Sequence, residues 1–197
     1  MFRIMVLRRL PSSIWHDPIV GDLISAGLGL GYDEMQLART TDAWLAAGAE
    51  LRDQVAEIVS GVAADVELVG SSSVLGLLAK PIVDLAVGLA AGQLLPPVAA
   101  RLEAAGWIYR GDAGDDGGQV FVLEARPWYR VAHLHVVEHD GSQWTNYVRF
   151  RDLLRRSAVA RDRYEAVKLR LAAQDHVDRK AYTTGKSEVV SSLLGGE

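Results

Sequence analysis

The spacing of hydrophobic positions predicts two helices among a set of short strands. Apolar residues recur at helical spacing from Thr41 or Asp42, either of which can cap the first turn, up to Gly61. Pro96 and Pro97 suit the first turn of a second helix, over about 96–105. Short runs rich in β-branched and aromatic residues, bounded by turn residues, predict strands at 66–70, 82–89, 107–110, 119–125 and 129–138.

The two ends of the chain differ from this middle part. Residues 1–35 show no sustained period and are predicted to form an irregular N-terminal arm. After residue 141 the pattern is helical over 142–157, with Ser142 as the N-cap, over about 158–174, and over 186–194, where Gly185 ends the preceding turn. We therefore expect an α/β fold in which a small mixed β-sheet flanked by helices (36–141) carries a C-terminal helical region (142–197).

Composition narrows the class of protein. The chain has 197 residues, 49% of them hydrophobic, which is enough for one real core, and a formal net charge of −4, which excludes a polycation that coats nucleic acid. Residues 142–180 nevertheless hold ten Lys or Arg against five Asp or Glu, so the helical region is basic. Without a signal-peptide pattern, or the ~20 apolar residues of a membrane span, a cytoplasmic protein with no membrane contact is expected.

Residues 70–87 carry the sharpest chemical pattern. Gly70, Ser71 and Ser72 follow a predicted strand, where backbone N–H groups and hydroxyls suit phosphate oxygens. Lys80 is close enough in sequence to reach a β- or γ-phosphate. Asp84 lies inside an otherwise apolar strand, which is costly unless it binds a cation or accepts hydrogen bonds. A buried aspartate satisfied within a turn is the structural alternative.

A histidine pair offers further ligands. His133 and His135 are one residue apart on a predicted strand, so both imidazoles project from one face. With Asp84 they would make an N,N,O set, completed by Glu124 or Glu138. The chain has no cysteine, so any metal must be held by oxygen and imidazole, and this set suits zinc or manganese better than magnesium. A core hydrogen-bonding histidine beside a half-exposed one is the alternative.

Several blocks, in order over roughly residues 40–195, make the chain resemble the GrpB family. They are Gly70-Ser71-Ser72-Ser73-Val74, Gly76-Leu77, Ala79-Lys80-Pro81-Ile82-Val83-Asp84, His133-Leu134-His135-Val136, Trp144, Phe150-Arg151-Asp152-Leu153-Leu154-Arg155, Tyr164 with Lys168, and Tyr182-Thr183-Thr184-Gly185-Lys186. The resemblance implies a nucleotidyltransferase-like fold that holds an NTP and a divalent cation, Mg²⁺ or Mn²⁺, with Zn²⁺ an option at the histidine pair.

The resemblance also ranks the basic residues. Lys168 and Lys186 match motif positions and, with Arg151, are candidate phosphate ligands, while Asp84 and Lys80 are the candidate catalytic residues. Asp84 matches the first carboxylate of the superfamily pattern, but the second position is Ala86. GrpB-like sequences usually have an apolar residue there too. A two-metal mechanism needs more than one bridging carboxylate, so this departure puts such a mechanism in doubt.

Two functions follow as hypotheses. The first is a nucleotidyltransferase that moves a nucleoside monophosphate from an NTP to an acceptor hydroxyl of a small molecule, a protein or an RNA such as tRNA, as some toxins of the wider superfamily do. Phosphate contacts from the basic helical region would attract an RNA acceptor. The alternative is a catalytically silent GrpB-like module that binds a nucleotide or a protein partner.

Overall fold

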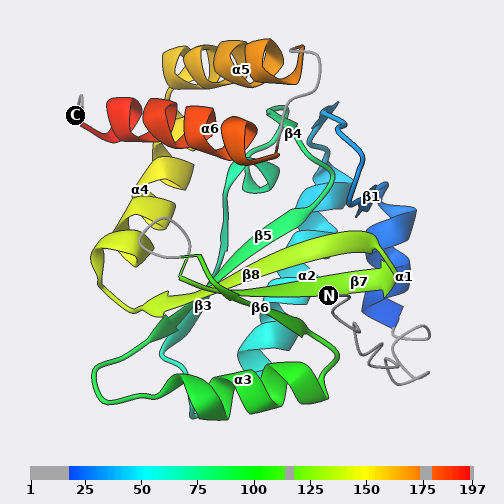
Figure 1. The fold of residues 1–197 in the computed structure, drawn as a ribbon, viewed down its shortest axis with the longest axis vertical. Coiled ribbons are helices and arrows are strands. Elements are labelled where there is room, and N and C mark those ends of the chain that lie inside the picture. The colour runs from blue at the N-terminus through cyan, green and yellow to red at the C-terminus, as the bar shows by residue number, and fades with distance from the viewer. Residues whose placement is uncertain (1–17, 114–117, 174–178, 196–197) are drawn as a thin grey trace, which may run out of the picture.

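A computed structural model describes residues 18–113, 118–173 and 179–195 (Figure 1). Its main sheet has the strand order β3-β5-β8-β7-β6, formed by Asp65–Val69, Val83–Leu89, Tyr129–Glu138, Gln119–Arg126 and Ile108–Asp112, with β1 (Leu30–Gly31) paired to β8. The β5–β8 pair is parallel and the other pairs are antiparallel. The predicted mixed sheet is confirmed, and each predicted strand is present within a few residues of its expected bounds.

One face of the sheet packs on the helices α1 (Pro18–Ser25), α2 (Asp42–Ile58) and α3 (Leu95–Ala104). The core there includes Leu51 of α2, Leu85 of β5 and Leu134 of β8, all without solvent exposure. Thr41 caps α2 by accepting a hydrogen bond from the Trp44 N–H at 3.2 Å, as the sequence predicted.

The other face lies under α4 (Ser142–Arg156), and α5 (Ala158–Ala172) and α6 (Arg179–Leu194) pack against α4 (Figure 1). Because side chains alternate along a strand, Asp84 and Ala86 face this side while Val83, Leu85 and Val87 enter the core. Shorter elements complete the fold: the 3₁₀ turn η2 (Ser71–Ser73) and the two-stranded sheet of β2 (Ala38–Arg39) and β4 (Leu78–Ala79).

Residues 18–35 are not irregular throughout, which corrects the expectation for the N-terminal arm. Helix α1 buries Val20 and Leu23, and Gly27 follows it with a φ of +88°, a conformation that suits glycine at a helix end. Eight residues with two buried positions are too few to establish a period in the sequence. Residues 1–17 lie outside the described part of the chain.

Two details of the C-terminal helices also differ from expectation. The N-cap of α4 is Gly141, in extended conformation, and not Ser142. Gly185 lies inside α6 and does not end a turn. A Cβ atom at Gly185 would lie 2.9 Å from Leu171 Cδ2, so glycine permits close approach of α6 to α5. Among the described residues, no helix is long and apolar enough to span a bilayer.

Candidate functional site

The turn that follows β3 is built around Gly70. Its φ of +70° and ψ of −171° belong to a region that essentially only glycine adopts. The Ser73 hydroxyl donates to the Gly70 carbonyl at 2.6 Å, and the Ser72 hydroxyl accepts from the backbone N–H of Asp84 at 3.2 Å. The predicted Gly-Ser segment therefore contacts the backbone of Asp84, the predicted catalytic residue, directly.

Asp84 and His133 lie opposite each other on the parallel strands β5 and β8. His133 Nδ1 is 3.4 Å from Asp84 Oδ1, and the side chains are 19% and 27% exposed, respectively. Burial alone would raise the pKa of Asp84, but the hydrogen bond and charge of His133, together with the charges of Lys186 and His135, hold that pKa below its ordinary value. The carboxylate is therefore ionised at neutral pH.

Lys168 enters the same region from α5 and is 1% exposed. Its Nζ donates to the Ser71 hydroxyl at 3.1 Å and to the Leu78 carbonyl. Burial lowers the pKa of Lys168 to about 7, and the charges of Lys186 and Lys80 act in the same direction against those of Asp84 and Glu165. The structure thus brings Lys80, Lys168 and Lys186 within electrostatic reach of one another.

Tyr164 also belongs to this group, although spacing alone had not marked it as functional. It is 1% exposed, and its ring lies 4.9 Å from Lys168 Nζ. Burial raises the pKa of the Tyr164 phenol, against the charge of Lys186 and hydrogen bonds with Ser71 and Lys186. The signal available in the sequence was the i, i+4 spacing of Tyr164 and Lys168, which places both on one side of a helix.

Two arginines of α4, Arg151 and Arg155, donate hydrogen bonds to β3 and to the turn that follows it. Arg151 is 8% exposed and donates to Glu67 Oε2 at 2.6 Å, to Asp152 Oδ1 at 2.8 Å and to the Leu68 carbonyl at 3.2 Å. Arg155 donates to the Ser73 carbonyl at 3.1 Å. Arg151, predicted as a phosphate ligand, is thus bonded to groups of β3 and α4, which suits a supporting role for the turn.

The predicted three-residue metal set is not formed. His135 lies opposite Ala86, and its ring centroid is 5.4 Å from that of Tyr147. Among the described residues, no group of three or more His, Asp or Glu is placed to hold a metal ion. Asp84 and His133 contact each other, so the residues do not fit a metal cage supplied by the protein, and the Mg²⁺, Mn²⁺ or Zn²⁺ expected from the sequence stays a prediction.

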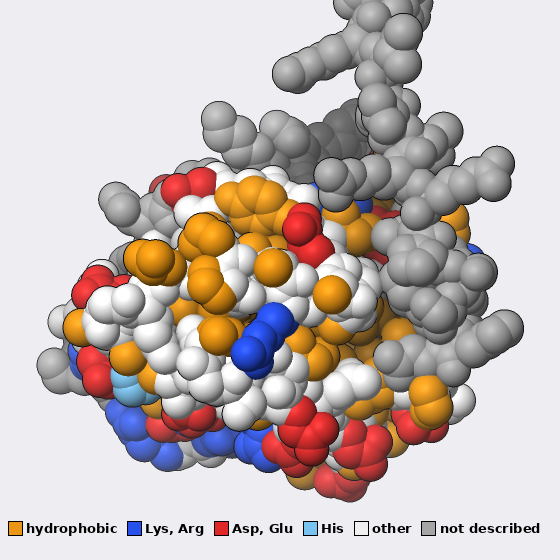
Figure 2. Space-filling view, turned by 90° about the horizontal axis from the view of Figure 1, so that it is seen from below, with side chains coloured by type: hydrophobic (Ala, Val, Ile, Leu, Met, Phe, Trp, Pro, Cys, Tyr) orange, Lys and Arg blue, Asp and Glu red, His pale blue; other side chains and the backbone are white. Residues whose placement is uncertain are grey.

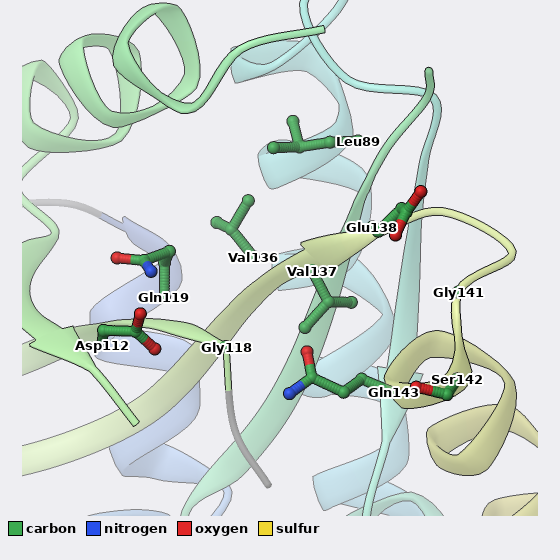
Figure 3. Close-up of a pocket in the computed structure, with 10 residues that line it drawn as sticks. All are labelled: Leu89, Asp112, Gly118, Gln119, Val136, Val137, Glu138, Gly141, Ser142 and Gln143. Carbon is green, nitrogen blue, oxygen red and sulfur yellow. The ribbon is translucent and has the colours of Figure 1, made fainter. Parts of the chain in front are cut away.

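Two glutamates, Glu124 and Glu138, were predicted as further metal ligands, and neither lies beside the Asp84–His133 pair. Glu124, 5% exposed, accepts hydrogen bonds from Tyr32 Oη and Arg110 at 2.7 Å, and from the Trp128 N–H at 3.1 Å. Glu138 lies at the far end of β8 and lines a cavity of about 460 Å³ with Leu89, Asp112, Gly118, Gln119, Val136, Val137, Gly141, Ser142 and Gln143 (Figure 3). The proposals that either one completes a metal site are therefore wrong for this structure.

The structure and the comparisons define the class as a mixed α/β protein with a C-terminal helical region. A family model described as "GrpB protein" matches residues 34–195, and the chain belongs to this family. It is 28% identical to the glutamate-rich protein GrpB of Alkalihalophilus pseudofirmus, over 85% of this chain and 98% of that protein. It is 37% identical to a UPF0157 protein of Streptomyces coelicolor, over 68% of each.

Solved structures agree with the fold. The GrpB protein of Enterococcus faecalis matches with a TM-score of 0.67 at 24% identity, over 82% of this chain and 98% of that one. A weaker similarity, with a TM-score of 0.49 at 14% identity, links 91% of this chain to 65% of a chain in the structure of the GLD-2/RNP-8 complex. The second is too distant to support an inference about function.

Proposed function

We propose that this protein binds a nucleoside triphosphate beside the Gly70 turn and transfers its nucleoside monophosphate to an acceptor hydroxyl. The observation that supports this most is the meeting of Ser71, Lys168 and Asp84 with the electrostatic field of Lys80 and Lys186. The resemblance to the GrpB family supports the choice of nucleotidyl transfer as the reaction class, and the lysines support the binding of a polyphosphate.

Charge favours an anionic ligand at this position. Lys168 lies within electrostatic reach of two further lysines, Lys80 and Lys186, and of two carboxylates, Asp84 and Glu165. Glu165 is already paired with Arg39 at 2.5 Å. A phosphate group beside Lys168 would favour the charged form of that lysine, because an opposite charge stabilises the ammonium ion that burial disfavours. Catalysis would depend on alignment of the acceptor with the α-phosphate and on charge neutralisation.

One observation favours the second candidate, a silent nucleotide-binding module. Ala86 stands where the wider superfamily has a second carboxylate, and it is fully buried in an apolar cluster with Val69, Val137 and Trp144. The Ala86 side chain supplies no oxygen that could bridge two metal ions. A protein that retained the phosphate-binding lysines without chemistry would look like this, so binding and transfer have to be measured separately.

Binding is tested by calorimetry with each of the four NTPs, with and without Mg²⁺. We expect Lys186→Met and Lys80→Met each to weaken NTP binding about 10- to 150-fold, since one charge-assisted hydrogen bond contributes about 1.5–3 kcal/mol. Arg52→Met is the matched control, because Arg52 pairs with its neighbour Asp53 on the opposite side of the sheet. Wild-type protein that binds no NTP at millimolar concentration would overturn the proposal.

Transfer is tested with α-labelled NTPs and either total RNA or extract protein as acceptor. We expect label on one acceptor class with the wild type and its loss in Asp84→Asn, with NTP binding retained. NTP binding without transfer to RNA, protein or water would leave the silent module as the function. The two acceptor arms also test whether the basic helices serve an RNA partner.

A further inference from the structure

The Asp84–His133 pair has the orientation of an acid–base dyad. The contact is made by Nδ1 of the imidazole, 3.4 Å from Asp84 Oδ1, and the ionised carboxylate can only accept a hydrogen bond. Nδ1 of a neutral His133 must therefore carry the proton. The lone pair of the neutral ring then lies on Nε2, at the opposite side of the imidazole.

Nε2 of His133 is buried and has no hydrogen-bond partner within the described part of the chain. A buried acceptor without a donor carries a desolvation cost, and in native structures such an atom calls for an explanation, such as a catalytic role or a bound molecule. The contact of His135 with Tyr147 shows that the second histidine of the strand has a different environment. The unpaired nitrogen belongs to the histidine that Asp84 orients.

We propose that His133 is the general base of the reaction and that Asp84 positions it, which rests on the function proposed above. The acceptor O–H bond breaks and its proton moves to Nε2, while the acceptor oxygen forms a bond to the α-phosphorus. The bond from that phosphorus to the bridging oxygen breaks, and pyrophosphate leaves with its electron pair. Asp84 then stabilises the imidazolium, which returns its proton to solvent.

The distance of 3.4 Å between His133 Nδ1 and Asp84 Oδ1 is compatible with an aspartate that positions a general base. Hydrogen bonds of catalytic groups are often long without substrate and tighten in the reacting complex. Lys186, which acts on Asp84 from α6, adds positive charge on the side where the triphosphate would lie. Asp84 thus acts through His133 as a positioning residue, in place of the metal-ligand role that the sequence suggested for both.

The tautomer is tested first, by ¹⁵N–¹H NMR of the imidazoles in the full chain at neutral pH. We expect His133 to carry its proton on Nδ1 in the wild type and to shift toward the Nε2–H form in Asp84→Asn. A wild-type His133 that is protonated on Nε2, or whose Nε2 resonance shows a bound metal, overturns the dyad whether or not transfer is found.

The catalytic role is tested by chemical rescue, with pyrophosphate release from ATP as the readout. His133→Ala should lower kcat about 10²–10⁴-fold with little change in KM, and added imidazole should restore part of the rate. His139→Ala is the matched control, because His139 Nδ1 also contacts an aspartate, Asp140, at 2.9 Å but lies outside the site.

The outcomes separate the two proposals. Transfer that His133→Ala leaves unchanged, or that imidazole does not rescue, overturns the base while the nucleotidyltransferase stands. Wild-type protein that shows the Nδ1–H tautomer without any release or transfer overturns the proposed function and, with it, the catalytic role of the pair.

Discussion

Gly70→Ala tests whether the turn and the Asp84–His133 pair form one unit. A Cβ atom at Gly70 would lie 2.7 Å from Asp84 Oδ2 and 3.2 Å from Asp84 Cβ. The φ of +70° adds backbone strain at the same position. Asp84 cannot yield freely, because its carboxylate contacts His133 and its N–H donates to Ser72.

The expected loss follows from these two contributions. Holding alanine in this backbone region costs about 1–3 kcal/mol, and losing a charge-assisted hydrogen bond costs about 1.5–3 kcal/mol. The free energy of unfolding should therefore fall by roughly 4 kcal/mol. In a chain of this length each kcal/mol shifts Tm by about 2–4 °C, so we expect Tm to fall by about 10 °C in a calorimetric scan.

Gly61→Ala is the control that separates the backbone strain of a positive φ from the steric contact with Asp84. Gly61 has a φ of +75°, but a Cβ there would meet no atom within 4 Å, so we expect a loss of about 1 kcal/mol. In an Asp84→Ala background, where the carboxyl group is absent, Gly70→Ala should lose most of its additional cost. Equal losses for Gly70→Ala and Gly61→Ala in the wild type would refute the steric argument.

Three other substitutions address the surrounding groups. The pKa of Lys168 falls from 10.5 to about 7 on folding, so the unfolded chain takes up the proton first as the pH falls. The free energy of unfolding should therefore decline from about pH 10 to pH 7 and then level off. Urea denaturation of Lys168→Met should lack this pH dependence, and parallel pH profiles for Lys168→Met and the wild type would contradict it. Arg151→Met should lower the free energy of unfolding by about 3 kcal/mol, because Glu67 loses its partner. The control Arg52→Met should lower it by less than about 0.5 kcal/mol. Similar urea midpoints for the two variants would contradict this prediction. Burial and the Glu124 carboxylate raise the pKa of Tyr32 to about 12, so Glu124→Gln should lower it in an ultraviolet titration referenced to Tyr32→Phe, and an unchanged value would exclude the charge effect.

The strands, and the shared face of the two histidines, were predictable from the sequence for a physical reason. A strand alternates its side chains, so the histidines two residues apart had to face one side of a sheet, and an aspartate within an apolar run marked β5 as a candidate neighbour. What the pattern did not contain was the register between β5 and β8. That register places His133, and not His135, beside Asp84, and it opposes His135 to Ala86.

Residues whose role depends on distant segments were harder to predict. Arg151 is of a residue type that often binds phosphate, but its guanidinium donates a hydrogen bond to Glu67, which is 84 positions earlier in the chain. Gly185 has the local signature of a turn, but it lies inside α6, and its close approach to Leu171 of α5 accounts for the glycine. In both cases tertiary contacts that have no local period override the local pattern.

The segregation of charge along the chain also has a different meaning in three dimensions. Some cations of the basic helical region bond groups of the protein itself: Arg155 bonds the Ser73 carbonyl, Arg161 the Leu154 carbonyl, and Lys168 the Ser71 hydroxyl. Others on α4 and α5 are exposed, among them Arg149, Arg156, Arg163 and Arg170. The end of the molecule around α3, away from α5 and α6, shows mainly hydrophobic and acidic side chains, and few basic side chains lie near the centre of this view (Figure 2). Long nucleic acids gain affinity from many exposed phosphate contacts. Arg155 and Lys168, which bond the Gly70 turn, favour a compact phosphate ligand at that turn, whereas the exposed arginines of α4 and α5 stay candidates for the RNA contacts that the transfer experiment tests.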